Sequence, residues 1–121
     1  MSKTPSTKPL YDLETRTLNF AKNVIQLCRN LKQEPSNRVL ISQAVRACGS
    51  IGANYREANE ALSKKDFAHR IKIARKEAKE AYYWLELIEA ANPDIDGQVK
   101  PLLQESRELR SILSAIAKKA E

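Results

Sequence analysis

Apolar residues recur every three or four positions along four separate stretches of the chain, and this spacing predicts amphipathic helices. The stripe positions of the first stretch are Leu10, Leu13, Thr17, Phe20, Val24, Leu27 and Leu31. Those of the second are Ile41, Ala44, Cys48, Ile51, Tyr55, Ala58 and Leu62. Those of the third are Phe67, Ile71, Ala74, Ala78, Ala81, Leu85 and Ile88. Those of the fourth are Val99, Leu102, Ser106, Leu109, Leu113, Ile116 and Ala120. No stretch alternates with the period of two that a strand requires, so the sequence predicts an all-α protein.

Local signals separate the first three helices. Glu34-Pro35 is expected to end the first helix, because the residue before a proline avoids the helical conformation. Ser36 or Asn37 is the expected N-cap of the second helix, which runs to about Leu62. Ser63, with Asp66 three residues later, has the form of a capping box and predicts the start of the third helix.

The remaining boundaries complete the domain. Asn92-Pro93 ends the third pattern, and the start of the fourth helix stays open around Gly97 to Pro101. Four helices with short connections predict an antiparallel up-down-up-down four-helix bundle over residues 10–121. Residues 1–9 contain prolines, serines and threonines among few apolar groups, and we expect them to form a disordered tail.

Two glycines, Gly49 and Gly52, lie inside the second helical pattern. Glycine costs about 1 kcal/mol in a helix interior relative to alanine, so two of them within four residues need a reason. We expect both to face a helix that approaches closely. The small residues of the third stripe, such as Ala74 and Ala78, indicate that this neighbour is the third helix.

The middle of the chain carries three motifs that resemble those of a known family. They are Ser-Ile-Gly-Ala-Asn-Tyr-Arg-Glu-Ala at 50–58, Ser-Lys-Lys-Asp-Phe at 63–67 and Lys-Glu-Ala-Lys-Glu-Ala-Tyr-Tyr-Trp-Leu at 76–85. The chain resembles the small bacterial "four helix bundle protein" family from about Leu13 to Ala117. That family includes proteins encoded in intervening sequences of bacterial large-subunit ribosomal RNA genes. The resemblance implies a non-enzymatic bundle that assembles into a ring, most often a pentamer. A related group serves as the accessory subunit of diversity-generating reverse transcriptases.

Composition limits the cellular context. With 30% charged residues and a net charge of +6, the protein is compatible with nucleic acid or other acidic partners. No apolar run is long enough to cross a membrane and no secretion signal is evident, so we expect a cytoplasmic protein without a membrane partner. Cys28 and Cys48 lie on different helices at different levels, and we expect two buried, reduced thiols rather than a disulfide.

The sequence offers no set of catalytic or metal-binding residues. Carboxylate-bridged metal sites in helical bundles use Glu-x-x-His pairs, and the single histidine, His69, has no glutamate three residues before it. No serine elbow or glycine-rich phosphate loop is present. We therefore expect no enzyme activity, no metal and no cofactor.

A line of basic residues runs along the third helix on the side opposite its apolar stripe. Its members are Lys65, His69, Lys72, Lys76 and Lys79. The line spans roughly 21 Å, and the phosphates of a nucleic-acid strand recur about every 6–7 Å, so several could be contacted together. Two interpretations stay open: a solvated helix face, or a ridge that binds the phosphates of RNA or DNA.

Large side chains beside the third stripe indicate a subunit interface. Ile73, Trp84 and Leu87 flank the stripe and exceed what one four-helix core needs, which is typical of an oligomer. Tyr82, Tyr83 and Trp84 could alternatively stack on bases, but packing is the preferred interpretation.

Polar residues near the turn between the second and third helices form a second expected cluster. An antiparallel turn near Ser63 would bring Glu57 level with Arg70, and Asn54 close to Glu77. We expect these four residues to fix the register of the two helices.

Taken together, the residues predict a non-catalytic oligomeric bundle that binds RNA or DNA, or supports a nucleic-acid enzyme such as a reverse transcriptase, through a basic face. The alternative is a structural or protein-interaction adaptor with no nucleic-acid role.

Overall fold

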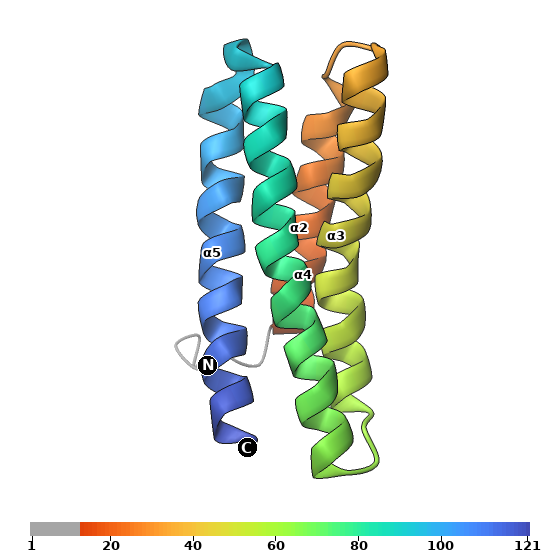
Figure 1. The fold of residues 1–121 in the computed structure, drawn as a ribbon, viewed down its shortest axis with the longest axis vertical. Coiled ribbons are helices and arrows are strands. Elements are labelled where there is room, and N and C mark those ends of the chain that lie inside the picture. The colour runs from red at the N-terminus through yellow and green to blue at the C-terminus, as the bar shows by residue number, and fades with distance from the viewer. Residues whose placement is uncertain (1–12) are drawn as a thin grey trace, which may run out of the picture.

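The computed structural model describes residues 13–121 as an up-down-up-down bundle of four long helices (Figure 1). The elements are α2 (Leu13–Arg29), α3 (Pro35–Asn59), α4 (Lys64–Ala91), the short 3-10 helix η2 (Pro93–Ile95) and α5 (Asp96–Lys119). This part of the chain contains no strand, which confirms the predicted fold class. The predicted tail at residues 1–9 and the predicted first stripe position, Leu10, lie outside the described residues.

One of the two predicted helix starts is right. The Ser63 hydroxyl accepts a hydrogen bond from the backbone N–H of Asp66 at 3.0 Å, as the capping box requires. The predicted caps of the second helix are wrong, because α3 already begins at Pro35 with Glu34 in the N-cap position. Proline suits a first helical position, where a backbone N–H would have no partner inside the helix.

Three other boundaries differ from or sharpen the prediction. α2 ends at Arg29 and not at the predicted Glu34-Pro35. α3 ends at Asn59 rather than near Leu62, and the Leu62 side chain in the connecting turn is 99% exposed. α5 begins at Asp96, directly after η2, and Pro101 lies just beyond its first turn. Because α3 ends earlier than predicted, its register against α4 also differs from the predicted one. Different polar side chains therefore meet across the two helices.

Most positions of the four predicted stripes lie in the core. Its largest fully buried apolar side chains are Phe20, Val24, Ile51, Ile71, Leu85, Ile88, Val99, Leu109 and Leu113. Cys28 and Cys48 are buried, unpaired thiols, as expected. Burial raises the pKa of Cys28 to about 11 and also raises that of Cys48, so both thiols stay protonated at neutral pH.

The helices pack around a square in which α2 lies diagonally opposite α4 (Figure 1). α3 and α4 share the most extensive contact, and α2 and α5 share the least. Across that loosest side, the Arg16 guanidinium donates paired hydrogen bonds of 2.7 and 2.9 Å to Glu105 and another of 2.7 Å to Glu108. A paired arginine–carboxylate contact fixes geometry better than a single one does, so it aligns α2 with α5.

A buried pair of amides connects the start of α3 with the end of α4. Asn37 on α3 and Asn92 at the end of α4 each donate a side-chain hydrogen bond to the other, at 3.0 and 2.9 Å. Asn37 also donates to the carbonyl of Lys32, and Asn92 donates to that of Ile88. Asn37, one of the two residues expected to cap α3, therefore joins the α2–α3 loop to the end of α4 instead.

The two glycines of α3 have different surroundings. A Cβ atom on Gly52 would lie 2.8 Å from Oγ1 of Thr17, so the expected close approach is present there, but the neighbour is α2 and not α4. The Thr17 hydroxyl donates to the Leu13 carbonyl at 2.9 Å, which holds it against the glycine. Gly49 is exposed with nothing within 4 Å of its Cβ position, so the expectation for Gly49 is wrong.

The pair of glycines provides a matched test of this close approach. We expect Gly49→Ala to raise the free energy of unfolding by about 0.5–1 kcal/mol, because alanine favours the helix and meets no neighbour. We expect Gly52→Ala to lower it by about 1 kcal/mol or more, because the new methyl group must displace the buried Thr17. Urea denaturation measures both. Equal stabilisation by the two variants would contradict close packing between α2 and α3.

Candidate nucleic-acid interface

The five residues of the predicted basic line lie on α4 and are all exposed. α4 is one uninterrupted helix of 28 residues, so their spacing of four, three, four and three positions keeps them on one face. These residues, Lys65, His69, Lys72, Lys76 and Lys79, form a basic stripe. The opposite face of α4 is the buried one, with Ile71, Ala74 and Ala78 in the core.

Few carboxylates neutralise the basic stripe. Within residues 13–121, its only ion pair is a loose one of 3.9 Å between the Lys76 ammonium and Glu77. Lys65, His69, Lys72 and Lys79 form no side-chain hydrogen bond or ion pair within the same residues. Exposed charges that lack internal partners are available to a charged ligand and add to a common electrostatic potential.

α5 adds basic residues beside α4 that the sequence argument did not identify. The Arg107 guanidinium lies over the Tyr82 ring of α4, with its central carbon 5.8 Å from the ring centroid. Arg110 follows one turn later on α5 and is exposed. The sequence pattern carried no signal for this pairing, because it did not define which residues of α5 lie level with Tyr82.

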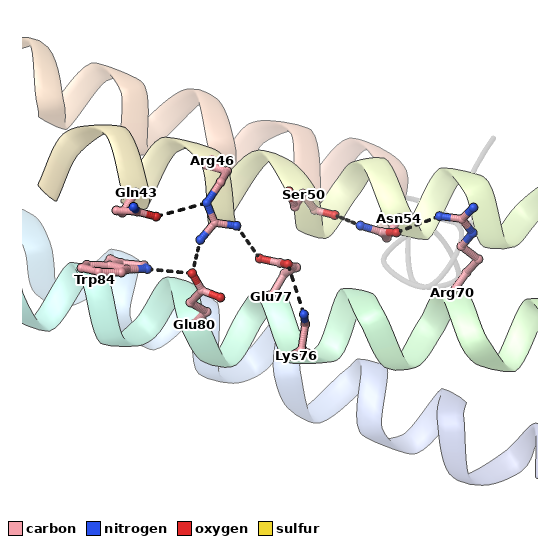
Figure 2. A network of polar contacts seen from close by, with 9 residues as sticks. All are labelled: Gln43, Arg46, Ser50, Asn54, Arg70, Lys76, Glu77, Glu80 and Trp84. Atoms are coloured by element: carbon pink, nitrogen blue, oxygen red, sulfur yellow. Dashed lines mark hydrogen bonds and ion pairs between the residues drawn. The ribbon is translucent and has the colours of Figure 1, made fainter. Parts of the chain in front are cut away.

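Two carboxylates of α4, Glu77 and Glu80, face α3, where an arginine holds them (Figure 2). Arg46 donates to Glu77 at 3.3 Å, to Glu80 and, at 3.2 Å, to Gln43. The Trp84 indole N–H also donates to Glu80, at 2.9 Å. The hydrogen bond from Trp84, together with the hydrogen bond and the positive charge of Arg46, lowers the pKa of the Glu80 carboxyl below its ordinary value. These contacts leave Glu77 and Glu80 poorly placed to neutralise the lysines on the outer face.

The predicted polar cluster is only partly formed. Arg70 donates to the side-chain oxygen of Asn54 at 3.3 Å, so these two residues meet (Figure 2). Glu77 instead pairs with Arg46, and the exposed Glu57 forms no side-chain hydrogen bond or ion pair within residues 13–121. The grouping of Glu57 and Glu77 with Arg70 and Asn54 is therefore corrected.

The error comes from the turn between the helices. Because α3 ends at Asn59 and not near Leu62, Asn54 rather than Glu57 lies level with Arg70, a shift of about one helical turn. The same register brings Arg46 level with Glu77 and Glu80 of α4. These pairings can be worked out from the sequence, but only when the end of α3 is placed correctly.

The predicted interface residues lie on the same side of the bundle as this network. Ile73, Trp84 and Leu87 are all half-buried. Trp84 packs against the core, whereas Ile73 and Leu87 lie outside it. Val39 on α3, one turn before Gln43, is 59% exposed. Apolar side chains that lie outside the core are therefore present on the α3–α4 side of the bundle.

Other kinds of site find no support in the part of the chain that the structure describes. Residues 13–121 contain no group of three or more His, Cys, Asp or Glu side chains that could hold a metal ion. No helix among them is long and apolar enough to span a membrane.

The geometry defines an antiparallel four-helix bundle with a basic outer face on α4. The family model for the 23S rRNA-intervening sequence protein matches residues 12–115, and the chain belongs to this family. The chain is also similar to a solved protein of unknown function from the S23 ribosomal protein family of Bacteroides thetaiotaomicron. The two share 35% sequence identity over 87% of this chain and 97% of that one, with a TM-score of 0.78. A comparison with curated proteins gave no match. The family resemblance inferred from the sequence motifs is confirmed.

Proposed function

We propose that this protein is a non-catalytic, homo-oligomeric bundle that binds the phosphate backbone of nucleic acid through the basic stripe. The observation that carries the proposal is the line of exposed cations on α4, of which only Lys76 has an ion-pair partner within residues 13–121. Such a line of charges attracts the phosphates of nucleic acid and releases their bound counterions.

The chemistry of the stripe sets the character of this binding. A lysine ammonium is a point charge and does not read base edges with paired hydrogen bonds. Binding is therefore weak per subunit, indifferent to sequence and strongly dependent on salt. An oligomer that repeats the stripe would add these weak contacts together. The family is named for intervening sequences of 23S rRNA, so RNA is the first ligand to test.

Fluorescence anisotropy with labelled RNA and DNA, each at low and physiological salt, tests the proposal. The expected result is binding of both at low salt, with little difference between unrelated sequences and a large loss at physiological salt. If neither is bound at low salt, the stripe is a solvated surface. The protein would then be a structural or protein-interaction adaptor, and the exposed apolar side chains beside α4 favour that role as the second candidate.

The proposed oligomer depends on the apolar α3–α4 side, and the family resemblance favours a pentameric ring. We expect wild-type protein to sediment as an oligomer at micromolar concentration, and Leu87→Glu to dissociate it with little change in helicity. Leu87 is the better position than Trp84, because Trp84 also packs on the core. Leu62→Glu is the matched control, since Leu62 is a fully exposed leucine in the α3–α4 turn. A wild-type monomer would show that these side chains do not form a subunit interface.

A further inference from the structure

One large aromatic side chain stands out at the end of the basic stripe. Tyr83 is 53% exposed and lies in the bundle's longest helix, about two turns before its end. It follows Lys79 by four residues and Lys76 by seven, so it lies on the same face of α4 as these two cations. The proposed phosphate contacts do not use Tyr83, and neither does the core.

The Tyr83 ring has a defined support. Its edge-to-face partner is the Trp84 ring, with centroids 5.1 Å apart and planes at 73°. Trp84 itself is fixed by its packing on the core and by the 2.9 Å hydrogen bond that it donates to Glu80. Glu80 is held in turn by Arg46 of α3 (Figure 2). An exposed aromatic ring on a fixed support loses little conformational freedom when a flat ligand stacks on it.

We propose that Tyr83 is a base-stacking platform and that the nucleic acid bound by the basic stripe is single-stranded. This inference rests on the proposed function and specifies its ligand. Tyr83 lies about 6 Å along the helix axis from Lys79, which is close to one nucleotide of an extended strand. A strand can therefore stack a base on Tyr83 while its adjacent phosphates meet Lys79 and Lys76. Stacking on an aromatic side chain tolerates any base but needs a base that is not already paired and stacked in a duplex.

The charges around Tyr83 also determine toward which end of α4 the strand extends. Glu86, three residues further along α4, is exposed and carries the charge that repels phosphate. The cations all lie on the other side of Tyr83, between it and the start of α4. The strand therefore runs from Tyr83 toward Lys65 and does not continue toward Glu86.

The experiment compares a short single-stranded RNA with the duplex of the same sequence, using the full chain and two substitutions at one position. We expect Tyr83→Ala to weaken binding of the single strand about tenfold and to leave duplex binding unchanged. Tyr83→Phe keeps the ring and should bind the single strand as wild type does. A second readout is the fluorescence of Trp84, the only tryptophan of the chain, which a base stacked on the neighbouring Tyr83 should quench.

The outcomes separate this inference from the proposed function. If wild type binds neither RNA, both fail. If wild type and Tyr83→Ala bind single strand and duplex equally well, phosphate binding stands and the stacking platform is wrong. If Tyr83→Ala instead changes the sedimentation of the protein without RNA, the ring belongs to a subunit interface, and the stacking assignment is overturned.

Discussion

Replacement of Asn92 by leucine is expected to lower the free energy of unfolding by about 2–4 kcal/mol, although the residue touches no proposed ligand. Asn92 and Asn37 are buried and exchange two hydrogen bonds of 2.9 and 3.0 Å. The substitution removes both and leaves the amide oxygen of Asn37 buried without its partner. A buried polar group that loses its partner costs more than an ordinary hydrogen bond contributes. Urea denaturation followed by circular dichroism gives the change.

Two further variants show whether the pair is the cause. Asn30→Leu changes an exposed asparagine whose only side-chain hydrogen bond within residues 13–121 is a long one of 3.5 Å, and it should alter stability by less than about 0.5 kcal/mol. The double variant Asn37→Leu with Asn92→Leu should be less destabilised than the sum of the single variants, because neither amide then remains unpaired. Strictly additive losses would contradict a coupled pair.

Changing Lys72, Lys76 and Lys79 together to glutamine is expected to weaken RNA binding by about a hundredfold at low salt. The three ammonium groups are exposed on one face of α4, and only Lys76 has a partner within residues 13–121, at 3.9 Å from Glu77. An exposed pair of this length contributes little to stability, so the variant should melt close to wild type. Anisotropy with labelled RNA measures the affinity, and circular dichroism measures the melting.

The matched control removes the same charge from other faces of the bundle. Lys22, Lys32 and Lys119 are exposed lysines outside α4, and their joint change to glutamine also lowers the net charge by three. If the position of the lysines on α4 matters, this control keeps most of the RNA affinity. The stripe variant, in which Lys72, Lys76 and Lys79 are changed, loses it. Equal losses in the two triple variants would mean that RNA responds to net charge alone.

The four helices could be predicted from the sequence because each carries a continuous apolar stripe, and burial of that stripe against its neighbours outweighs local preferences. Two helix boundaries were predictable from local signals, and one is the end of α4 before Asn92-Pro93. The other is the start of α4, where a side chain caps the helix. Ser63 does so, and its prediction is confirmed. The start of α3 depends on Pro35, which fits a first turn without any side-chain cap, and the usual capping signals at Ser36 and Asn37 were therefore misleading.

Contacts between helices were harder to predict, because they depend on the register that the turns set. A difference of three residues in the end of α3 exchanged Glu57 for Asn54 as the partner of Arg70. Gly49 and Gly52 look alike in the sequence, but only Gly52 faces the Thr17 hydroxyl of α2. Asn37 and Asn92 are 55 residues apart, and no local pattern indicates that they meet. The basic stripe was predictable because it lies on a single helix, whereas the contact of Arg107 with Tyr82 joins two helices.

The salt dependence of RNA affinity tests phosphate binding by the basic stripe most directly. It is measured by anisotropy on wild type and on both triple variants with the same labelled single strand. Three lysines that each neutralise one phosphate give a slope of log affinity against log salt of about −2 for a single strand. We predict this slope or a steeper one for wild type and for the control variant, and a slope shallower by about 2 for the stripe variant. The same slope in all three proteins, or no binding by wild type at low salt, would contradict phosphate binding by the basic stripe.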